Sequence, residues 1–224
     1  MTHEYVPPTL VVDAVVFQIM HNKLQVLLIK RARDPFKDVW ALPGGYNPKG
    51  EATHEAFRRV LKTKAGIDES ALGLVEQLYT FDTQARDPRG HAVSVTYMGL
   101  GRNVEPQAGS ATEQPQFFPI DELPELAYDH AGIITYALER LRSKITYTTA
   151  ISSLLADHFT FAQLQNAYET VLGRSLDKRN FRKKFLSFDA IVATDEFTAQ
   201  AAHRPAQFFA FTHDDIQSLA RSFD

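Results

Sequence analysis

The 224-residue sequence contains no cysteine. Disulfide bonds, thiolate nucleophiles, cysteine-ligated zinc and iron–sulfur clusters are therefore excluded, and any catalysis would have to use oxygen or nitrogen groups. The sequence also lacks a run of about 18 apolar residues, which a membrane-spanning helix needs. Its first residues, Met1 to Glu4, form neither the basic segment nor the apolar segment of an export signal. We therefore expect a cytoplasmic protein that does not insert into a membrane.

The chain also has little net charge, because 24 Lys and Arg residues and 27 Asp and Glu residues give −3 at pH 7. Residues 1–143 contain 15 basic and 18 acidic residues, whereas residues 144–224 contain 9 of each. Between Arg174 and Lys184, however, six basic residues accompany one acidic residue, Asp177. A phosphate backbone responds to charge within a Debye length of about 8–10 Å, so the overall acidity does not exclude binding to nucleic acid.

The first part of the chain alternates between strand and helix patterns. Four apolar, β-branched segments predict strands: residues 10–20, 24–30, 74–82 and 92–101. The turn at His21-Asn22 joins the first two strands into a hairpin. Apolar residues at helical spacing predict one helix from Ala52 to Ala65, ending at Gly66, and a second helix with an apolar stripe from Ile133 to Leu141. Residues 1–143 are therefore predicted to form an α+β domain.

The second part, residues 144–224, has a different pattern. Three short helices are predicted over residues 149–155, 161–172 and 177–185, with Thr160 as an N-cap and Gly173 as a C-cap. Two alternating segments, 191–197 and 207–211, predict a hairpin closed by the loop around residues 202–205. Three helices followed by a hairpin is the order of a winged helix-turn-helix. A short helical junction near residue 144 would couple the two domains mechanically.

A glycine-rich motif precedes the first helix. The segment Trp40-Ala41-Leu42-Pro43-Gly44-Gly45, followed by a glutamate and the helix, resembles the Nudix hydrolase motif. Six residues agree with the spacing of that motif: Gly45, Glu51, Arg59, Leu61, Gly66 and Ile67. The resemblance covers residues 8–143 and implies a mixed sheet with flanking helices.

Three positions of this motif depart from the family. Val60, Thr63 and Lys64 occupy the places of the helical glutamates, which in the family hold divalent cations. Magnesium needs oxygen ligands, and a lysine would bring positive charge to the position of the metal. We therefore predict no metal site and no catalytic residues. The alternative is an ADP-ribose or nucleoside-diphosphate hydrolase that uses Glu51 and Glu55 with other ligands, in which the second part of the chain serves only assembly.

The remaining features of this domain fit a diphosphate ligand that is bound without turnover. Guanidinium groups match the geometry of phosphate, and aromatic side chains on the strands could stack on adenine. The candidate ligand-binding residues are Arg31, Arg33, Gly44, Gly45, Glu51, Tyr79, Phe81, Arg89 and Tyr97. Asp129 is expected to cap the second helix.

The segment from Leu176 to Phe185 combines apolar anchors with cations at helical spacing. Phe181 and Phe185 are predicted to face the core, which leaves the basic side chains on the outer face, where they could enter a major groove. The candidate DNA-binding residues are Thr160, Lys178, Arg179, Asn180, Arg182, Lys183 and Arg204. The alternative is a protein-binding module, for which no salt-dependent affinity for DNA is expected.

The order of the two domains resembles the Nudix-related transcriptional regulators of NAD metabolism. That resemblance implies a homodimeric repressor that binds a palindromic operator near genes of NAD biosynthesis and releases it when ADP-ribose occupies the Nudix domain. It implies double-stranded DNA and ADP-ribose as partners, no resident cofactor, and a place at the nucleoid. Within the same architecture, a sugar or sugar phosphate is the alternative effector, because a fold does not determine its ligand.

Overall fold

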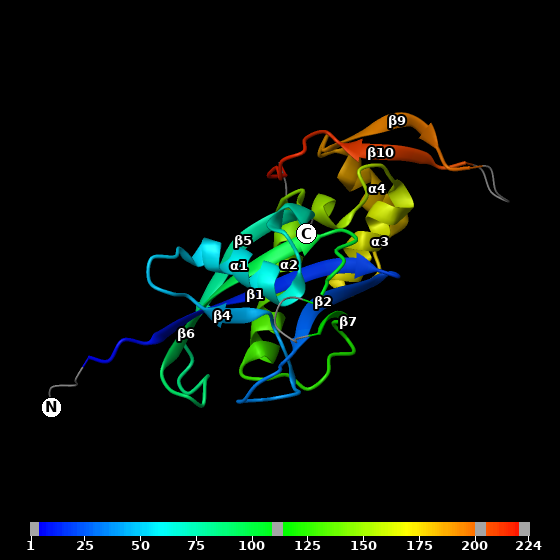
Figure 1. Ribbon diagram of the computed structural model, residues 1–224. Helices are drawn as coiled ribbons and strands as arrows, with labels where there is room; N and C mark the ends of the chain where they lie inside the picture. Colours follow the sequence, from blue (N-terminus) through cyan, green and yellow to red (C-terminus); the bar gives the residue numbers. More distant parts are fainter. Residues whose placement is uncertain (1–4, 109–113, 200–204, 220–224) are drawn as a thin grey trace.

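The structure, a computed structural model, describes residues 5–108, 114–199 and 205–219. Its first part is built on a mixed sheet with the strand order β3-β2-β1-β6-β5, to which β4 and β7 add by pairing with β1 and β2 (Figure 1). The strands are β1 (Thr9–Met20), β2 (Lys23–Lys30), β3 (Trp40–Ala41), β4 (Gly44–Tyr46), β5 (Leu72–Phe81), β6 (Ala92–Gly101) and β7 (Pro115–Pro119). Strands β1 and β6 are parallel, and the other pairs are antiparallel.

The predicted hairpin is confirmed. His21 and Asn22, which connect β1 to β2, have φ angles of 52° and 59°, as the tight turns favoured in β-hairpins require. Strand β5 begins two residues before the predicted segment. Strand β7 was missed, because its prolines at positions 115 and 119 are unfavourable in a central strand. Strand β7 pairs antiparallel with residues Gln25 to Ile29 of β2.

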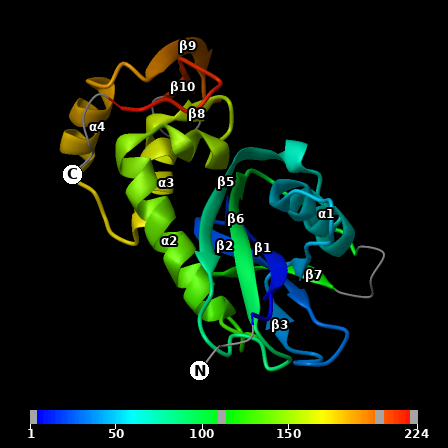
Figure 2. The same ribbon diagram turned by 90° about the vertical axis from the view of Figure 1, so that its left-hand side faces the viewer.

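Two helices cover opposite faces of this sheet (Figure 2). Helix α1 (Thr53–Ala65) buries an apolar stripe that includes Phe57 and Leu61, and it ends at Gly66, whose φ of 67° is left-handed. A short 3₁₀ helix, η1 (Glu69–Ala71), leads from α1 into β5. Helix α2 (His130–Tyr147) buries its own stripe, from Ile133 to Ile145, against the other face. Both predicted helices are confirmed.

The second part is a winged helix-turn-helix, as predicted. It comprises η2 (Ala150–Leu154), β8 (Phe159–Thr160), α3 (Phe161–Leu172), α4 (Lys178–Leu186), β9 (Ile191–Phe197) and β10 (Gln207–Phe211). The three strands pair in the order β8-β10-β9. The first predicted helix of this part is a 3₁₀ helix. Helix α3 ends at Gly173, with a φ of 68°, so the predicted C-cap is confirmed.

The two parts share one hydrophobic core. Buried residues of β6 and α2, such as Leu100 and Leu141, belong to the same cluster as Tyr168 of α3 and Phe185 of α4. Helix α2 runs through the predicted boundary between residues 143 and 144 and continues to Tyr147. The domains are therefore joined by a continuous helix, which agrees with the expected helical junction. Among the described helices, none has the length and apolar character to cross a membrane.

Candidate functional sites

A cavity of about 670 Å³ lies beside strands β1 and β4 of the mixed sheet. Its walls come from β4, the segment after β2, the loop between β5 and β6, and the start of α2. The lining residues are Val11, Asp13, Ile29, Arg31, Ala32, Arg33, Asp34, Leu42, Gly44, Gly45, Tyr46, Lys64, Arg86, Asp87, Arg89, Tyr128 and His130. The structure thus brings together five of the predicted ligand-binding residues: Arg31, Arg33, Gly44, Gly45 and Arg89.

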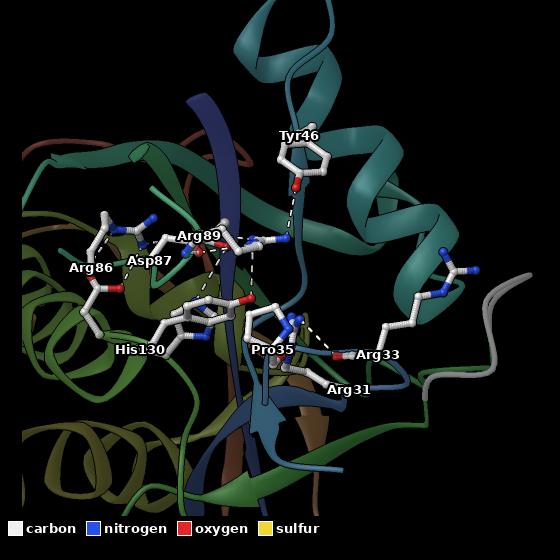
Figure 3. Close-up of polar contacts among 11 residues, drawn as sticks. Arg31, Arg33, Pro35, Tyr46, Arg86, Asp87, Arg89 and His130 are labelled. Atoms are coloured by element: carbon white, nitrogen blue, oxygen red, sulfur yellow. Dashed lines mark hydrogen bonds and ion pairs between the residues drawn. The ribbon is translucent and has the colours of Figure 1, made fainter. Parts of the chain in front are cut away.

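Arg31 and Arg33 follow β2 on one side of the cavity. The Nε atom of Arg31 donates a hydrogen bond to the carbonyl of Pro35 at 2.9 Å, and its guanidinium lies 4.9 Å from the ring centroid of Tyr128. The guanidinium of Arg33 is exposed and lies apart from the other labelled side chains (Figure 3). One arginine is therefore held in position, and the other extends into solvent.

Arg89 joins two tyrosines across the cavity. Its guanidinium donates to both carboxylate oxygens of Asp87, at 2.9 and 2.6 Å, and to the hydroxyl groups of Tyr46 at 2.9 Å and Tyr128 at 3.4 Å (Figure 3). The hydrogen bonds from Arg89 hold the pKa of Asp87 below its usual value. The two aromatic rings are thereby fixed in orientation at the mouth of the cavity.

A buried polar network forms the floor. Asp13 of β1 accepts hydrogen bonds from Ser94 at 2.6 Å and from Arg86 at 3.4 Å. Arg86 also donates to both oxygens of Asp129, at 2.9 and 2.8 Å. A Cβ atom on Gly44 would lie 2.1 Å from the Asp13 carboxylate, so a residue without a side chain is required there. Asp13, Ser94 and Arg86 of this floor are buried, whereas Asp129 is partly exposed.

His130 completes this floor at the first residue of α2. Its Nδ1 atom accepts a hydrogen bond from the backbone N–H of Leu42 at 2.9 Å, so a neutral ring carries its proton on Nε2, 3.9 Å from Asp13. Burial lowers the pKa of His130, although the charges of Asp13 and Asp129 oppose this shift. The ring is therefore neutral at physiological pH.

Four predicted ligand-binding residues lie outside the cavity. Tyr97 is buried under α1, where its hydroxyl bonds to Thr53 at 2.8 Å. Tyr79 and Phe81 pack with Tyr136 of α2, on the face of the sheet that α2 covers. The carboxylate of Glu51 accepts two hydrogen bonds of 2.7 Å from Arg59. For Tyr79, Phe81 and Tyr97, the face to which the side chain points depends on the strand register. The predicted ligand contacts of these three residues and of Glu51 stay predictions.

The predicted set left out eight polar or aromatic side chains that line the cavity: Asp13, Asp34, Tyr46, Lys64, Arg86, Asp87, Tyr128 and His130. Among the strand residues, Asp13 carried a signal, as a carboxylate within an apolar strand. Asp129 does precede α2, but its side chain makes no capping hydrogen bond and binds Arg86 instead. That part of the prediction was wrong because a buried guanidinium competes for the same carboxylate.

The second site lies on the helix-turn-helix. Helix α4 begins after Asp177, whose carboxylate accepts a hydrogen bond of 2.8 Å from the backbone N–H of Asn180. Phe181 and Phe185 are buried, as predicted, and the candidate DNA-binding residues of α4 are all exposed: Lys178, Arg179, Asn180, Arg182 and Lys183. A basic face is thus presented to solvent along the whole helix.

Side chains of α3 hold the turn that positions α4. Glu169 accepts a hydrogen bond from the backbone N–H of Leu176 at 2.8 Å, and Gln165 donates to the carbonyl of Leu176 at 2.9 Å. The guanidinium of Arg182 lies 4.5 Å from the ring centroid of Phe161 and 5.8 Å from that of Phe209. The hydrogen bonds fix the turn before α4, and the aromatic rings hold the guanidinium of Arg182.

The remaining two candidate DNA-binding residues are placed differently. Thr160 is only 8% exposed, and its hydroxyl accepts a hydrogen bond of 3.2 Å from the N–H of Gln163. The predicted N-cap is thus confirmed, whereas burial argues against the predicted DNA contact of the same side chain. Arg204 lies outside the described residues.

Comparison with known proteins agrees with this architecture. Residues 9–137 match the model of the NUDIX domain, and residues 151–211 match that of the NrtR DNA-binding winged helix domain. A protein of Acinetobacter baylyi named an ADPR-responsive transcriptional repressor is 34% identical over 217 residues, which cover 95% of this chain and 85% of the relative. The chain belongs to the NrtR family. The predicted domain boundary lies between the two matched ranges and stays a prediction.

Solved structures extend the comparison. NrtR of Shewanella oneidensis in complex with a 27mer DNA has a TM-score of 0.79 and 29% identity, and the match covers 96% of this chain and 99% of that one. The NUDIX domain of the same protein in complex with ADP ribose matches 61% of this chain and 90% of that one, with a TM-score of 0.56 and 33% identity. An ADP-ribose pyrophosphatase of Methanocaldococcus jannaschii is 37% identical over 58% of this chain and 73% of its own length.

The residues of the Nudix motif in this NrtR family member do not fit a divalent cation. Val60 is buried, the hydroxyl of Thr63 donates to the carbonyl of Arg59 at 2.8 Å, and Lys64 lines the cavity. Of the remaining acids, Glu51 is bound by Arg59, and Glu55 accepts a hydrogen bond from the N–H of Ala52 at 2.8 Å. Among the described residues, no three His, Asp or Glu side chains lie close enough together to hold a metal ion.

Proposed function

We propose that this protein is a homodimeric transcriptional repressor that binds operator DNA through α4 and senses ADP-ribose in the cavity beside β4. The observation that carries the proposal is the exposed basic face of α4, which lies within the range matched to the NrtR DNA-binding winged helix domain. A helix of this kind fits the major groove, where Arg182 can pair with guanine and Asn180 with adenine.

ADP-ribose is the effector that we assign to the cavity. The related repressor of Acinetobacter is named as ADPR-responsive, and the NUDIX domain of Shewanella NrtR has been crystallised with ADP ribose. In this chain, Arg31 and Arg33 are suited to the diphosphate, and the fixed rings of Tyr46 and Tyr128 are suited to stacking on the base.

Helix α2 provides a physical route between the two sites. It begins at His130 on the floor of the cavity and ends inside the winged helix domain. There the hydroxyl of Tyr168 donates to the carbonyl of Ile145 at 3.2 Å, and Arg142 donates to the carbonyl of Val171 at 2.9 Å. We infer that a ligand-dependent shift at the start of α2 moves α3 and α4 with it.

In a dimer, two α4 helices would occupy successive major grooves about 34–36 Å apart. ADP-ribose would favour an arrangement that breaks this spacing. Because the coupling is reciprocal, operator DNA must weaken ADP-ribose binding by the same factor, typically about 5–150-fold. Such a protein acts in the cytoplasm, at the nucleoid.

Hydrolysis is the second candidate function, favoured by the pyrophosphatase from Methanocaldococcus that the Nudix part resembles. We propose that this chain does not catalyse the metal-dependent reaction, because Glu51 and Glu55 are both engaged and the other motif positions lack carboxylates. Release of AMP from ADP-ribose in the presence of Mg²⁺ would contradict this and favour the enzyme.

The decisive experiment is a fluorescence-anisotropy titration of DNA fragments from upstream of the protein's own gene and its neighbours. We expect binding that weakens with increasing salt and is released by ADP-ribose. If DNA binding is unchanged by ADP-ribose but is released by a sugar or sugar phosphate, the repressor function stands and the effector is the sugar or sugar phosphate. Failure to bind any fragment would overturn the DNA-binding function and leave a protein-binding module or a hydrolase.

A further inference from the structure

Tyr128 has a backbone conformation that tyrosine rarely adopts. Its φ angle is 58°, in the left-handed region where the Cβ atom crowds the carbonyl oxygen that follows. Of the described non-glycine residues with positive φ, Tyr128 alone lines the cavity. Such a conformation persists only where neighbouring contacts hold it, and strained residues of this kind cluster at ligand clamps and switches. The surroundings of Tyr128 therefore show what holds the strain.

The ring of Tyr128 is held by four neighbouring side chains. The guanidinium of Arg31 lies 4.9 Å from the ring centroid, and that of Arg89 lies 6.0 Å from it. Arg89 also donates a hydrogen bond to the hydroxyl group at 3.4 Å. The rings of Phe36 and His130 lie 4.8 and 5.2 Å away, centroid to centroid. Because Arg31 and Arg89 also line the cavity, a ligand bound there changes the contacts of this ring.

The backbone of Tyr128 joins the sheet to α2. Before it, Leu126 forms a bridge with Trp40 of β3, and the N–H of Ala127 donates to the carbonyl of Trp40 at 2.8 Å. After it, α2 begins at His130 and continues into the winged helix domain. A change of φ at Tyr128 would therefore turn the start of α2 relative to a fixed strand, as hinge residues at the end of an element do.

A diphosphate competes with the ring for Arg31. Hydrogen bonds between a guanidinium and a phosphate are charge-assisted, and they are stronger than the contact of a guanidinium with an aromatic face. Bound phosphate would therefore draw Arg31 from the ring and remove one of the contacts that hold Tyr128. The hydrogen bonds of Asp129 and His130 oppose a movement of α2, so the ligand must supply the difference through its own contacts.

We propose that Tyr128 is the switch residue through which ADP-ribose moves α2: its ring contacts hold the backbone left-handed in the empty cavity, and bound ligand releases it to an ordinary φ. The inference rests on the proposed function, because it takes ADP-ribose as the ligand and operator release as the response. It adds a named residue and a change of backbone conformation at the start of the route along α2. The ring, once free of Arg31, packs on the ligand, which agrees with stacking on the base.

Two variants without the ring test the backbone conformation by itself. Glycine accepts a positive φ at little cost, whereas a β-branched residue does not. Without ADP-ribose, Tyr128→Val should therefore bind operator about 5–150-fold more weakly than Tyr128→Gly, the range typical of such coupling. Fluorescence anisotropy measures both affinities, and circular dichroism of the full chain shows whether each variant is folded. Equal operator affinities of the two folded variants would overturn the inference.

The second test measures operator release and stands by itself if Tyr128→Val does not fold. Tyr46→Ala is the matched control for Tyr128→Gly, because Tyr46 also lines the cavity and accepts a hydrogen bond from Arg89 at 2.9 Å, but lies on β4. Calorimetry should show weaker ADP-ribose binding in both variants. At saturating ADP-ribose, Tyr46→Ala should release operator by the wild-type factor, whereas the factor for Tyr128→Gly should approach one.

The outcomes separate this inference from the proposed function. Full release of operator by Tyr128→Gly at saturating ADP-ribose would overturn the role of Tyr128 and leave the repressor and its effector in place. Loss of release in Tyr46→Ala as well as in Tyr128→Gly would also overturn it, because the coupling would then depend on the cavity as a whole. A wild-type chain whose operator binding does not respond to ADP-ribose would overturn the proposed effector and this inference with it.

Discussion

The arginines of the cavity and the arginines of α4 are held in place by different means. Arg86 is 4% exposed and is fixed by two carboxylates, whereas Arg182 is exposed and rests on the rings of Phe161 and Phe209. A buried carboxylate neutralises the charge that it orients, but an aromatic face orients a guanidinium and leaves its outer edge available. The cavity thus gains rigidity, and α4 keeps positive charge for a long polyanion.

The largest effect is expected at the buried pair. Arg86→Met should lower the free energy of unfolding by about 3–5 kcal/mol, because Asp13 and Asp129 lose their shared partner and Asp13 is almost fully buried. Arg89→Met is the matched control in the same loop. Its side chain is 45% exposed, and Asp87 would keep the hydrogen bond of 2.9 Å from the backbone N–H of residue 89, so only about 0.2–1 kcal/mol is expected. Urea denaturation checks both values, and equal losses in the two variants would contradict the distinction.

The next effect concerns DNA rather than stability. Arg182→Ala should weaken operator binding by about 1–3 kcal/mol, because α4 loses an exposed guanidinium that we expect to contact a base. The affinity for ADP-ribose should be unchanged, and Arg58→Ala, an exposed arginine of α1, is the control. Anisotropy and calorimetry measure the two affinities. Unchanged operator affinity in Arg182→Ala would show that this side chain does not contribute to DNA binding.

Thr160 separates a capping role from a DNA contact. Thr160→Ala should lower the free energy of unfolding by about 1 kcal/mol, because α3 loses the hydrogen bond from Gln163 to the threonine hydroxyl. Thr160→Ser keeps the hydroxyl and should be close to wild type. With only 8% of Thr160 exposed, the slope of operator affinity against salt should not change in either variant. A shallower dependence of operator affinity on salt in Thr160→Ala would indicate that Thr160 contacts a phosphate of the DNA.

The last prediction is a pH dependence of stability that comes from a single buried group. Burial lowers the pKa of His130 below its value of about 6.5 in an unfolded chain, so the unfolded state binds more protons as pH falls below 6.5. Stability should therefore fall in that window, by at most about 1.4 kcal/mol per pH unit for this one group. His130→Asn retains an acceptor for the Leu42 N–H and should flatten the dependence. Urea denaturation of both proteins at several pH values tests this prediction. If the stability of His130→Asn depends on pH as strongly as that of the wild type, groups other than His130 cause the dependence.

Local signals predicted the elements of this fold well. Gly66 and Gly173 end their helices in left-handed conformations, and the strands over residues 92–101, 191–197 and 207–211 have the predicted bounds. These features depend on residues close in sequence, through capping, turn geometry and periodicity. The cavity was predicted less well. The structure places the predicted loop arginines on its wall and Tyr79 and Tyr97 away from it, since a strand residue faces one side or the other according to pairing.

By itself, the sequence determined the two domain types, the absence of cysteine chemistry, the missing carboxylates at positions 60, 63 and 64, and the apolar and basic faces of the helix from Lys178 to Leu186. Each follows from composition or from spacing within a few residues. Only the tertiary structure decided that Arg86 meets both Asp13 and Asp129, that His130 receives the Leu42 N–H, and that α2 joins the cavity to the winged helix. Such contacts join residues that lie from about 40 to 90 positions apart in the chain. Strand register and the packing of a shared core bring these residues together, and neither is encoded in any short segment.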